Sequence, residues 1–103
     1  MDLSVSQKWQ KMTTRIQSIV TQICDAVTSS GCYYPVPMDK GRAFYVANMP
    51  HILTGLKDRG FNAVHSLVGV GTDGRLYDIA NASDHVVALV HSVLEQSYII
   101  VSH

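Results

Sequence analysis

Hydrophobic residues recur at alternating steps of three and four along the first quarter of the chain. This spacing places them on one side of a helix, while lysine, arginine and glutamine occupy the other side. The stripe consists of Val5, Trp9, Met12, Ile16, Ile19, Ile23 and Val27. The pattern predicts a long amphipathic helix over residues 4–29, followed by Gly31 as its terminating glycine.

Shorter segments follow the helix. Residues 32–41 contain two prolines and predict an extended connection, because proline removes backbone donors and disfavours helix in its neighbour. Residues 42–48 have the β-branched and aromatic character of a short strand. Pro50 is typical of the first turn of a helix, and Gly60 is placed to end that helix.

The second half of the chain predicts a hairpin, a helix and a last strand. Residues 61–70 are apolar on both faces, as in an interior strand, and residues 75–80 return as its partner. The intervening Gly71-Thr72-Asp73-Gly74 is a turn signal, because Asp-Gly suits the positive φ angles of tight hairpins. Ser83 and Asp84 predict the start of a helix with Val86, Leu89, Val90 and Val93 on one side, and residues 98–101 predict the final strand.

The element order after the first helix is therefore β-α-β-β-α-β. This order is typical of the ferredoxin-like two-layer sandwich, in which two helices cover one face of an antiparallel sheet. We expect one α+β domain over residues 1–103. In it, the helix at 4–29 precedes a βαββαβ core at 42–103.

Alternation assigns the predicted strand residues to two faces of the sheet. The expected core face carries Val64, Val68, Val70, Tyr77 and Ile79. The expected open face carries Phe61, Ala63, His65, Leu67, Gly69, Leu76, Asp78 and Ala80, joined by Tyr45 from the first strand. The open face is too apolar to stand fully in water, so we expect it to contact something.

Composition and charge narrow the possible functions. The 103 residues are 47% hydrophobic and 16% charged, with a net charge of zero. This balance is typical of a globular domain and lacks the basic excess of proteins that bind nucleic-acid phosphates, so we expect no nucleic-acid partner. No run approaches the ~20 apolar residues of a membrane span, and the first residues do not resemble a secretory signal. With two cysteines, read as reduced thiols, we expect a cytoplasmic protein without membrane contact.

A thiol site is the first candidate for chemistry. The order Cys32, His65, Asp78 resembles that of transglutaminase-like and papain-type thiol enzymes, and implies nucleophile, base and orienting carboxylate. A two-residue hairpin loop would place Asp78 opposite Gly69, and a four-residue loop would place it opposite His65. Cys32 follows a helix instead of beginning one, which counts against an activated thiolate.

RNA binding and metal binding are the other candidates. Residues 44–49 (FYVANM) resemble the first-strand hexapeptide of RNA-recognition motifs, which implies base stacking on Tyr45. Asp78 on the same face would repel phosphate. The five histidines form no i, i+4 pair and no CxxC motif accompanies them, so we expect no metal site and no cofactor.

We therefore expect a small non-enzymatic protein-binding module, such as a regulator, inhibitor or assembly subunit. The apolar stripe of the first helix would either lie on the sheet of its own chain or pair with the same helix of a second copy. The partner would be another protein or a second copy, bound through the first helix or the open sheet face. A thiol hydrolase or transferase and an RNA-binding protein are the alternatives. The expected contact residues are Trp9, Met12, Ile16, Ile19, Ile23, Tyr45, His65, Leu67 and Asp78.

Overall fold

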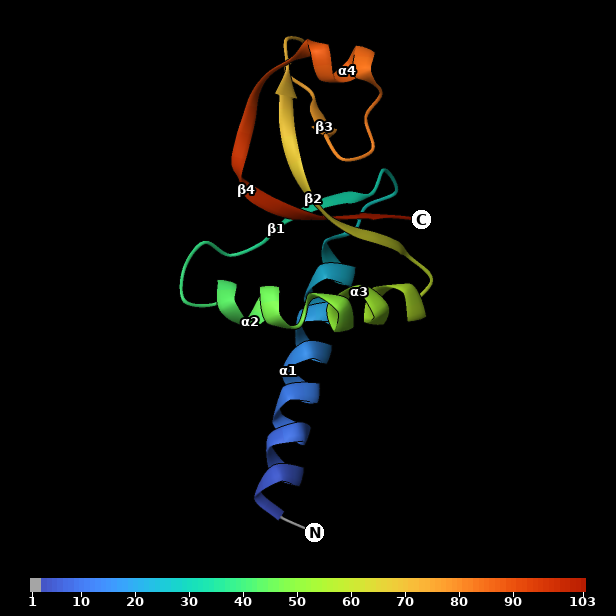
Figure 1. Ribbon diagram of the computed structural model, residues 1–103. Coiled ribbons are helices and arrows are strands. Elements are labelled where there is room, and N and C mark those ends of the chain that lie inside the picture. Colours follow the sequence, from blue (N-terminus) through green and yellow to red (C-terminus); the bar gives the residue numbers. More distant parts are fainter. Residues whose placement is uncertain (1–2) are drawn as a thin grey trace.

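The computed structural model describes residues 3–103, with the side chains of residues 10–93 and 96–103. The chain folds as an α+β protein in which one long helix stands beside a twisted sheet (Figure 1). In chain order the elements are α1 (Leu3–Ala26), β1 (Cys32–Pro35), α2 (Arg42–Ala47), α3 (Met49–Asp58), β2 (Asn62–Gly71), β3 (Leu76–Asp78), α4 (Asp84–Leu89) and β4 (Val90–Ser102).

The four strands form one antiparallel sheet in the order β1-β4-β2-β3. The long strands β2 and β4 lie in the centre, and the short strands β1 and β3 lie at opposite edges. Two shifts of register interrupt the β2–β4 ladder, between Leu67 and Gly69 and between Val70 and Gly71. The sheet is therefore long and bent, and its two ends have different neighbours.

The predicted strand at residues 42–48 is wrong, because this segment forms α2. The carboxylate of Asp39 accepts a hydrogen bond from the Gly41 amide (2.9 Å) ahead of the first turn, and the Asn48 side chain donates to the Phe44 carbonyl oxygen (2.9 Å) at its end. Tyr45 then begins a buried helical stripe that runs on through α3. The spacing of that stripe is four, three and four, over Tyr45, Met49, Ile52 and Leu56.

The predicted βαββαβ core over 42–103 is accordingly not found, and a ferredoxin-like order is not confirmed. The fourth strand is β1, whose residues were expected to be a connection; they pair with β4 from Cys32↔Val101 to Pro35↔Tyr98. The last strand begins at Val90, eight residues earlier than expected. The expected helix starts are correct for α3, with Pro50 in its first turn, and for α4, where the Ser83 hydroxyl accepts from the Val86 amide.

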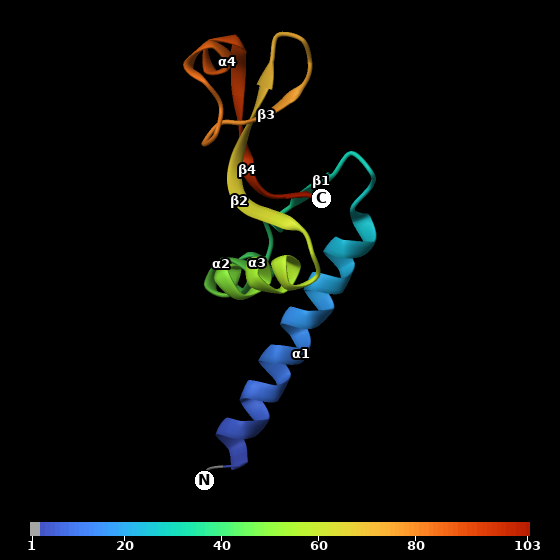
Figure 2. The same ribbon diagram turned by 90° about the vertical axis from the view of Figure 1, so that its right-hand side faces the viewer.

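The core lies between three helices and one end of the sheet. The second half of α1 and the pair α2–α3 pack together and cover the face that carries Ala63, Ile99 and Val101 (Figure 2). The helices contribute Ile16, Ile19, Val20, Ile23, Tyr45, Met49, Ile52 and Leu56 to this core. We call this region the packed middle.

Our assignment of the sheet faces is wrong at this end of β2. The helices cover Ala63, which was expected on the open face, and they leave Val64 exposed. Val68, by contrast, is buried as expected. Because β2 is apolar on both faces, alternation divides its residues into two sets but cannot say which set the helices cover.

The β2–β3 hairpin has a register between our two alternatives. Its loop contains three residues, Thr72 to Gly74, since the Gly71 amide bonds to the Arg75 carbonyl oxygen (2.9 Å). Gly74 has φ +77°, so the loop matches a type I turn followed by a left-handed residue. Asp78 therefore pairs with Val68, not with Gly69 or His65.

The molecule is elongated, with extents of 56 × 27 × 19 Å and a radius of gyration of 15.9 Å, whereas a compact chain of this length has about 13 Å. Figures 1 and 2 show why: the first half of α1 projects from one end, and the β2–β3 hairpin with α4 forms the other end. We call residues 3–15 the projecting half of α1 and residues 66–95 the distal lobe. Among residues 3–103, no helix is both long and apolar enough to cross a membrane.

Candidate functional site

The projecting half of α1 continues the buried stripe into solvent. Among the α1 side chains that the structure describes, from Gln10 onward, Ile16 is the first that is buried in the core, and Met12, one turn earlier on the same face, is 37% exposed. Position 9 precedes Ile16 by about two turns, so the apolar pattern of the sequence extends along the same side of the helix. Beside this stripe, the Arg15 guanidinium lies 3.9 Å from the centre of the Phe44 ring.

A groove begins where α1 leaves the packed middle. It measures about 220 Å³, and its walls come from α1 and α3: Met12, Thr13, Ile16, Gln17, His51, Thr54, Gly55 and Asp58. The helices meet at its closed end, because Gly55 has no side chain to hold Val20 away. Arg59 joins the same two helices by donating to Thr21 Oγ1 (3.0 Å) and Gln17 Oε1 (3.3 Å). The groove is thus held open by rigid elements.

Among the side chains that the structure describes, half of the exposed large hydrophobic ones lie on the distal lobe. None of the residues of α4 is buried, although half of them are valine or leucine. Within the described part of the lobe, Val68 is the one large apolar side chain that is fully buried. The exposed side chains are Leu67 (52%), Leu76, Val87, Leu89 and Val93 (56%). A second apolar surface therefore lies opposite the projecting half of α1.

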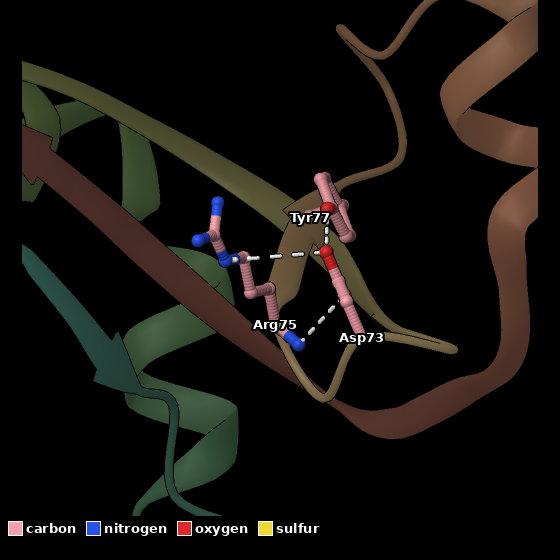
Figure 3. A network of polar contacts seen from close by, with 3 residues as sticks. All are labelled: Asp73, Arg75 and Tyr77. Carbon is pink, nitrogen blue, oxygen red and sulfur yellow. Dashed lines mark hydrogen bonds and ion pairs between the residues drawn. The ribbon is translucent and has the colours of Figure 1, made fainter.

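A polar network holds the tip of the distal lobe (Figure 3). The Tyr77 hydroxyl donates to Asp73 Oδ2 (2.6 Å), the Arg75 amide donates to Asp73 Oδ1 (3.0 Å), and the Arg75 guanidinium lies 3.9 Å from Oδ2. The Tyr77 hydrogen bond, followed by the Arg75 amide, lowers the pKa of Asp73, and the same bond raises the pKa of Tyr77. The network fixes the turn and keeps a carboxylate at the tip.

A second carboxylate, Asp78, is committed to structure at the base of the lobe. It accepts hydrogen bonds from the Ser66 hydroxyl, from Asn81 Nδ2 (2.6 Å) and from the Ala80 amide (3.2 Å). Burial would raise the pKa of Asp78, but these hydrogen bonds outweigh burial, so its pKa is lowered. Asp78 therefore joins β2 to the loop before α4 as an anion.

The structure does not bring Cys32, His65 and Asp78 together. Asp78 bonds to Ser66, and His65 precedes Ser66 on β2, so the imidazole and the carboxylate lie on opposite faces of the sheet. Cys32 lies on β1, which β4 separates from β2 by two strand spacings, about 10 Å. Burial raises the pKa of the Cys32 thiol, the opposite of what a thiolate nucleophile requires.

Two other expected site residues lie in different surroundings, since Tyr45 is buried and His65 is exposed on β2. Tyr45 lies on α2 and is 8% exposed within the core, so its ring offers no open face for a base. Burial and then the Arg42 charge lower the pKa of His65. In the described part of the chain, no three His, Cys, Asp or Glu residues are grouped as a metal site would require.

The uncovered face of the sheet at the packed middle carries a smaller apolar row. Tyr33, Ile100 and Val64 follow one another across β1, β4 and β2 in directly paired positions. Tyr33 and Val64 are exposed and Ile100 is half-buried. This row continues the apolar surface from one edge of the sheet to its centre.

Of the residues expected to form a contact surface, the structure exposes Met12, His65 and Leu67 and leaves Asp78 half-buried. It buries Ile16, Ile19, Ile23 and Tyr45. Trp9 lies on the projecting half of α1, and its side chain is outside the described residues. Sequence reasoning placed Leu76 on the open face but missed Val87, Leu89 and Val93 as surface residues, because it treated the segment after Ser83 as one amphipathic helix up to Val93. The helical spacing of the apolar residues in this segment gave no signal that they are exposed. No family model, no curated protein and no solved structure matches this chain.

Proposed function

We propose that this chain is a non-enzymatic interaction module that functions by binding a second copy of itself. One observation carries the proposal: the chain leaves exposed apolar side chains at both ends of an elongated molecule. Monomeric proteins rarely leave such patches uncovered unless they are interaction sites. At the two ends, the exposed large apolar residues are Met12 on α1 and the five of the distal lobe, and four more are exposed between the ends: Tyr33, Met38, Val46 and Val64.

The amount of exposed surface supports a partner of ordinary size. The chain exposes 6740 Å², whereas a compact monomer of this length exposes about 5,700 Å². The difference of about 1,000 Å² is close to the roughly 800 Å² that each partner contributes to a standard protein interface. If a partner covered the two ends, the exposed surface area of this chain would fall to about that of a compact protein of the same length.

The catalytic alternative has less support. A thiol enzyme needs a nucleophile, a base and an orienting group within hydrogen-bond reach of one another. Here the cysteine and the histidine lie on strands that are not neighbours, and the carboxylate lies on the other face. The RNA-binding alternative relies on a stacking ring at Tyr45, which is in the core.

The proposal is tested by sedimentation equilibrium on two matched variants. Met12→Asp places a carboxylate on the exposed apolar stripe of α1, and Thr14→Asp places the same charge on the other side of the helix. Both positions are exposed, so both variants should fold, as circular dichroism will show. We expect the wild type and Thr14→Asp to be dimers and Met12→Asp to dissociate.

Ile16 is a poorer choice for this test, because it is buried in the core and an aspartate there would unfold the chain. A wild-type chain that stays monomeric at millimolar concentration would overturn the proposal. So would a dimer that Met12→Asp and Thr14→Asp weaken equally, because the apolar stripe would then have no part in the contact.

A further inference from the structure

The two ends of the molecule carry opposite charge. The projecting half of α1 contains Lys8, Lys11 and Arg15, and the sequence has no acidic residue from Leu3 to Cys24. The distal lobe contains four acidic residues and one basic residue, a net of three negative charges. These are Asp73, Asp78, Asp84 and Glu95, with Arg75. A chain of zero net charge is thus strongly polarised along its length.

Each end also presents apolar surface beside its charge. On α1, Lys11 and Arg15 are exposed within one turn of Met12, and on the distal lobe Asp84 is exposed on α4, the helix that also carries the exposed Val87 and Leu89. Apolar contact with complementary charge around it is the usual composition of a specific interface. The two ends therefore match one another in both properties.

The two ends of one chain cannot meet. Figures 1 and 2 place them on opposite sides of the packed middle, and the molecule is 56 Å long. The second half of α1 is fixed in the core through Ile16, Val20 and Ile23, so the helix cannot fold back towards the lobe. Only a second molecule can bring a distal lobe to the projecting half of α1.

We infer that two copies pair antiparallel, so that the projecting half of α1 of each copy lies against the distal lobe of the other. This inference rests on the proposed self-association and specifies its surfaces. A two-fold axis makes both contacts equivalent and closes the assembly at a dimer. The same contact without closure would generate an open filament.

Pairing of α1 with α1 fits the charges less well. Two projecting halves that cross antiparallel would bring the lysines and arginines of both helices beside one seam, where like charges repel. Added salt would then strengthen the dimer. A contact between α1 and the distal lobe joins opposite charges, so added salt weakens it. We expect the dissociation constant to rise by roughly tenfold between 50 and 500 mM salt.

Charge reversal tests the inference directly. The helix variant is Lys8→Glu with Lys11→Glu, and the lobe variant is Asp84→Lys with Ser92→Lys. The side chains of Lys11, Asp84 and Ser92 are exposed. We expect each variant alone to raise the dissociation constant by roughly tenfold or more. The control, Lys40→Glu with Lys57→Glu, makes the same charge change as the helix variant, but at exposed sites outside both ends. It should leave the dissociation constant within about threefold of the wild-type value.

Mixing the two variants is the decisive measurement. The glutamates of the helix variant then face the lysines of the lobe variant, and the second contact of the pair keeps its native charges. We expect a heterodimer with a dissociation constant within about threefold of the wild type. Size-exclusion chromatography with one variant labelled will detect it, and circular dichroism will confirm that each variant is folded.

Other outcomes overturn the inference and separate it from the proposed function. If the lobe variant dimerises as the wild type does while Met12→Asp dissociates, self-association stands but the lobe is not the partner of α1. If the mixture forms no heterodimer although the wild type dimerises, the antiparallel pairing is wrong. If the wild type itself is monomeric, the proposed function fails, and the inference fails with it.

Discussion

The packed middle and the distal lobe share the same two central strands but differ in what covers them. Around Ala63 and Val101, three helices cover one face of the sheet and bury a continuous core. Beyond Ser66 the same strands meet only a three-residue strand and a six-residue helix with no buried residue. The lobe therefore relies on backbone pairing and on hydrogen bonds to Asp73 and Asp78, where the middle relies on apolar burial.

This difference assigns stability and recognition to different parts of the molecule. A chain of 103 residues buries too little surface to stabilise every part of itself equally well. Here the helices concentrate the burial at one place, and both ends are left with apolar surface that a second molecule can cover. Stability is thus expected to reside in the middle and recognition at the ends.

The largest expected effect compares two aliphatic residues of equal size. Ile52→Ala removes a fully buried side chain from the packed middle and should lower the free energy of unfolding by about 2–5 kcal/mol. Leu89→Ala removes a half-exposed side chain from the distal lobe and should cost less than about 1 kcal/mol. Urea unfolding, at concentrations below those of self-association, measures both. Equal costs would show that the lobe is part of the same core.

The next effect concerns the contact that sets where α1 leaves the middle. A methyl group on Gly55 would lie 2.7 Å from Val20 Cγ2, and Val20 is fully buried and stiff, so the helices must separate. We expect Gly55→Ala to cost about 1–3 kcal/mol in urea unfolding. Thr54→Ala, at an exposed neighbouring position, is the control and should change stability by less than about 0.5 kcal/mol.

A double variant identifies the cause. In the double variant Val20→Ala with Gly55→Ala, the smaller residue at position 20 removes the clash. The double variant should therefore lose less free energy of unfolding than the sum of the two single variants, by about 1 kcal/mol. Strict additivity would mean that Gly55 acts through some other contact. The projecting half of α1 would then not depend on this approach of the helices.

The helices of the middle were largely readable from the sequence, because long apolar stripes have one physical explanation. The stripe around Ile16 and Ile23 predicted α1, and Pro50 predicted the start of α3. The segment at Tyr45 was misread because six residues are too short for propensity to separate a strand from a helix. Its helical spacing becomes visible only when Tyr45 is counted with Met49, Ile52 and Leu56 across the proline.

The distal lobe was harder to predict, because single-residue choices decide it. Gly74 takes a left-handed conformation and makes the loop three residues long, which shifts Asp78 by one position and puts it on the other face from His65. Val90 to Val93 fit a helix by spacing, yet their backbone pairs with β2, since an uncovered strand offers hydrogen-bond partners that spacing cannot reveal. The surface of the lobe depends on both features.

The smallest expected effect is confined to the tip of the lobe and depends on pH. Tyr77→Phe keeps the ring that lies over Gly71 but removes the donor to Asp73, so the pKa of Asp73 should rise towards its ordinary value near ~4. Because the folded pKa of Asp73 is depressed, its contribution to stability is complete above the unfolded value and is lost as pH falls through the folded value. The pKa of Tyr77 is raised by the same hydrogen bond. The contribution of that bond to stability is therefore lost as the pH rises through the pKa of Tyr77 in the folded protein, which lies above ~10.

Carboxyl titration by NMR measures the shift of Asp73, and urea unfolding at pH 3 and pH 7 measures its consequence. We expect Tyr77→Phe to be less stable than the wild type at pH 7 and to differ less from it as the pH falls through the lowered folded pKa of Asp73. An unchanged pKa of Asp73 would show that the Tyr77 hydroxyl does not depress it and that the Arg75 amide and charge are the causes. Asp78 is the internal control, because its partners Ser66, Ala80 and Asn81 are untouched and its lowered pKa should stay where it is.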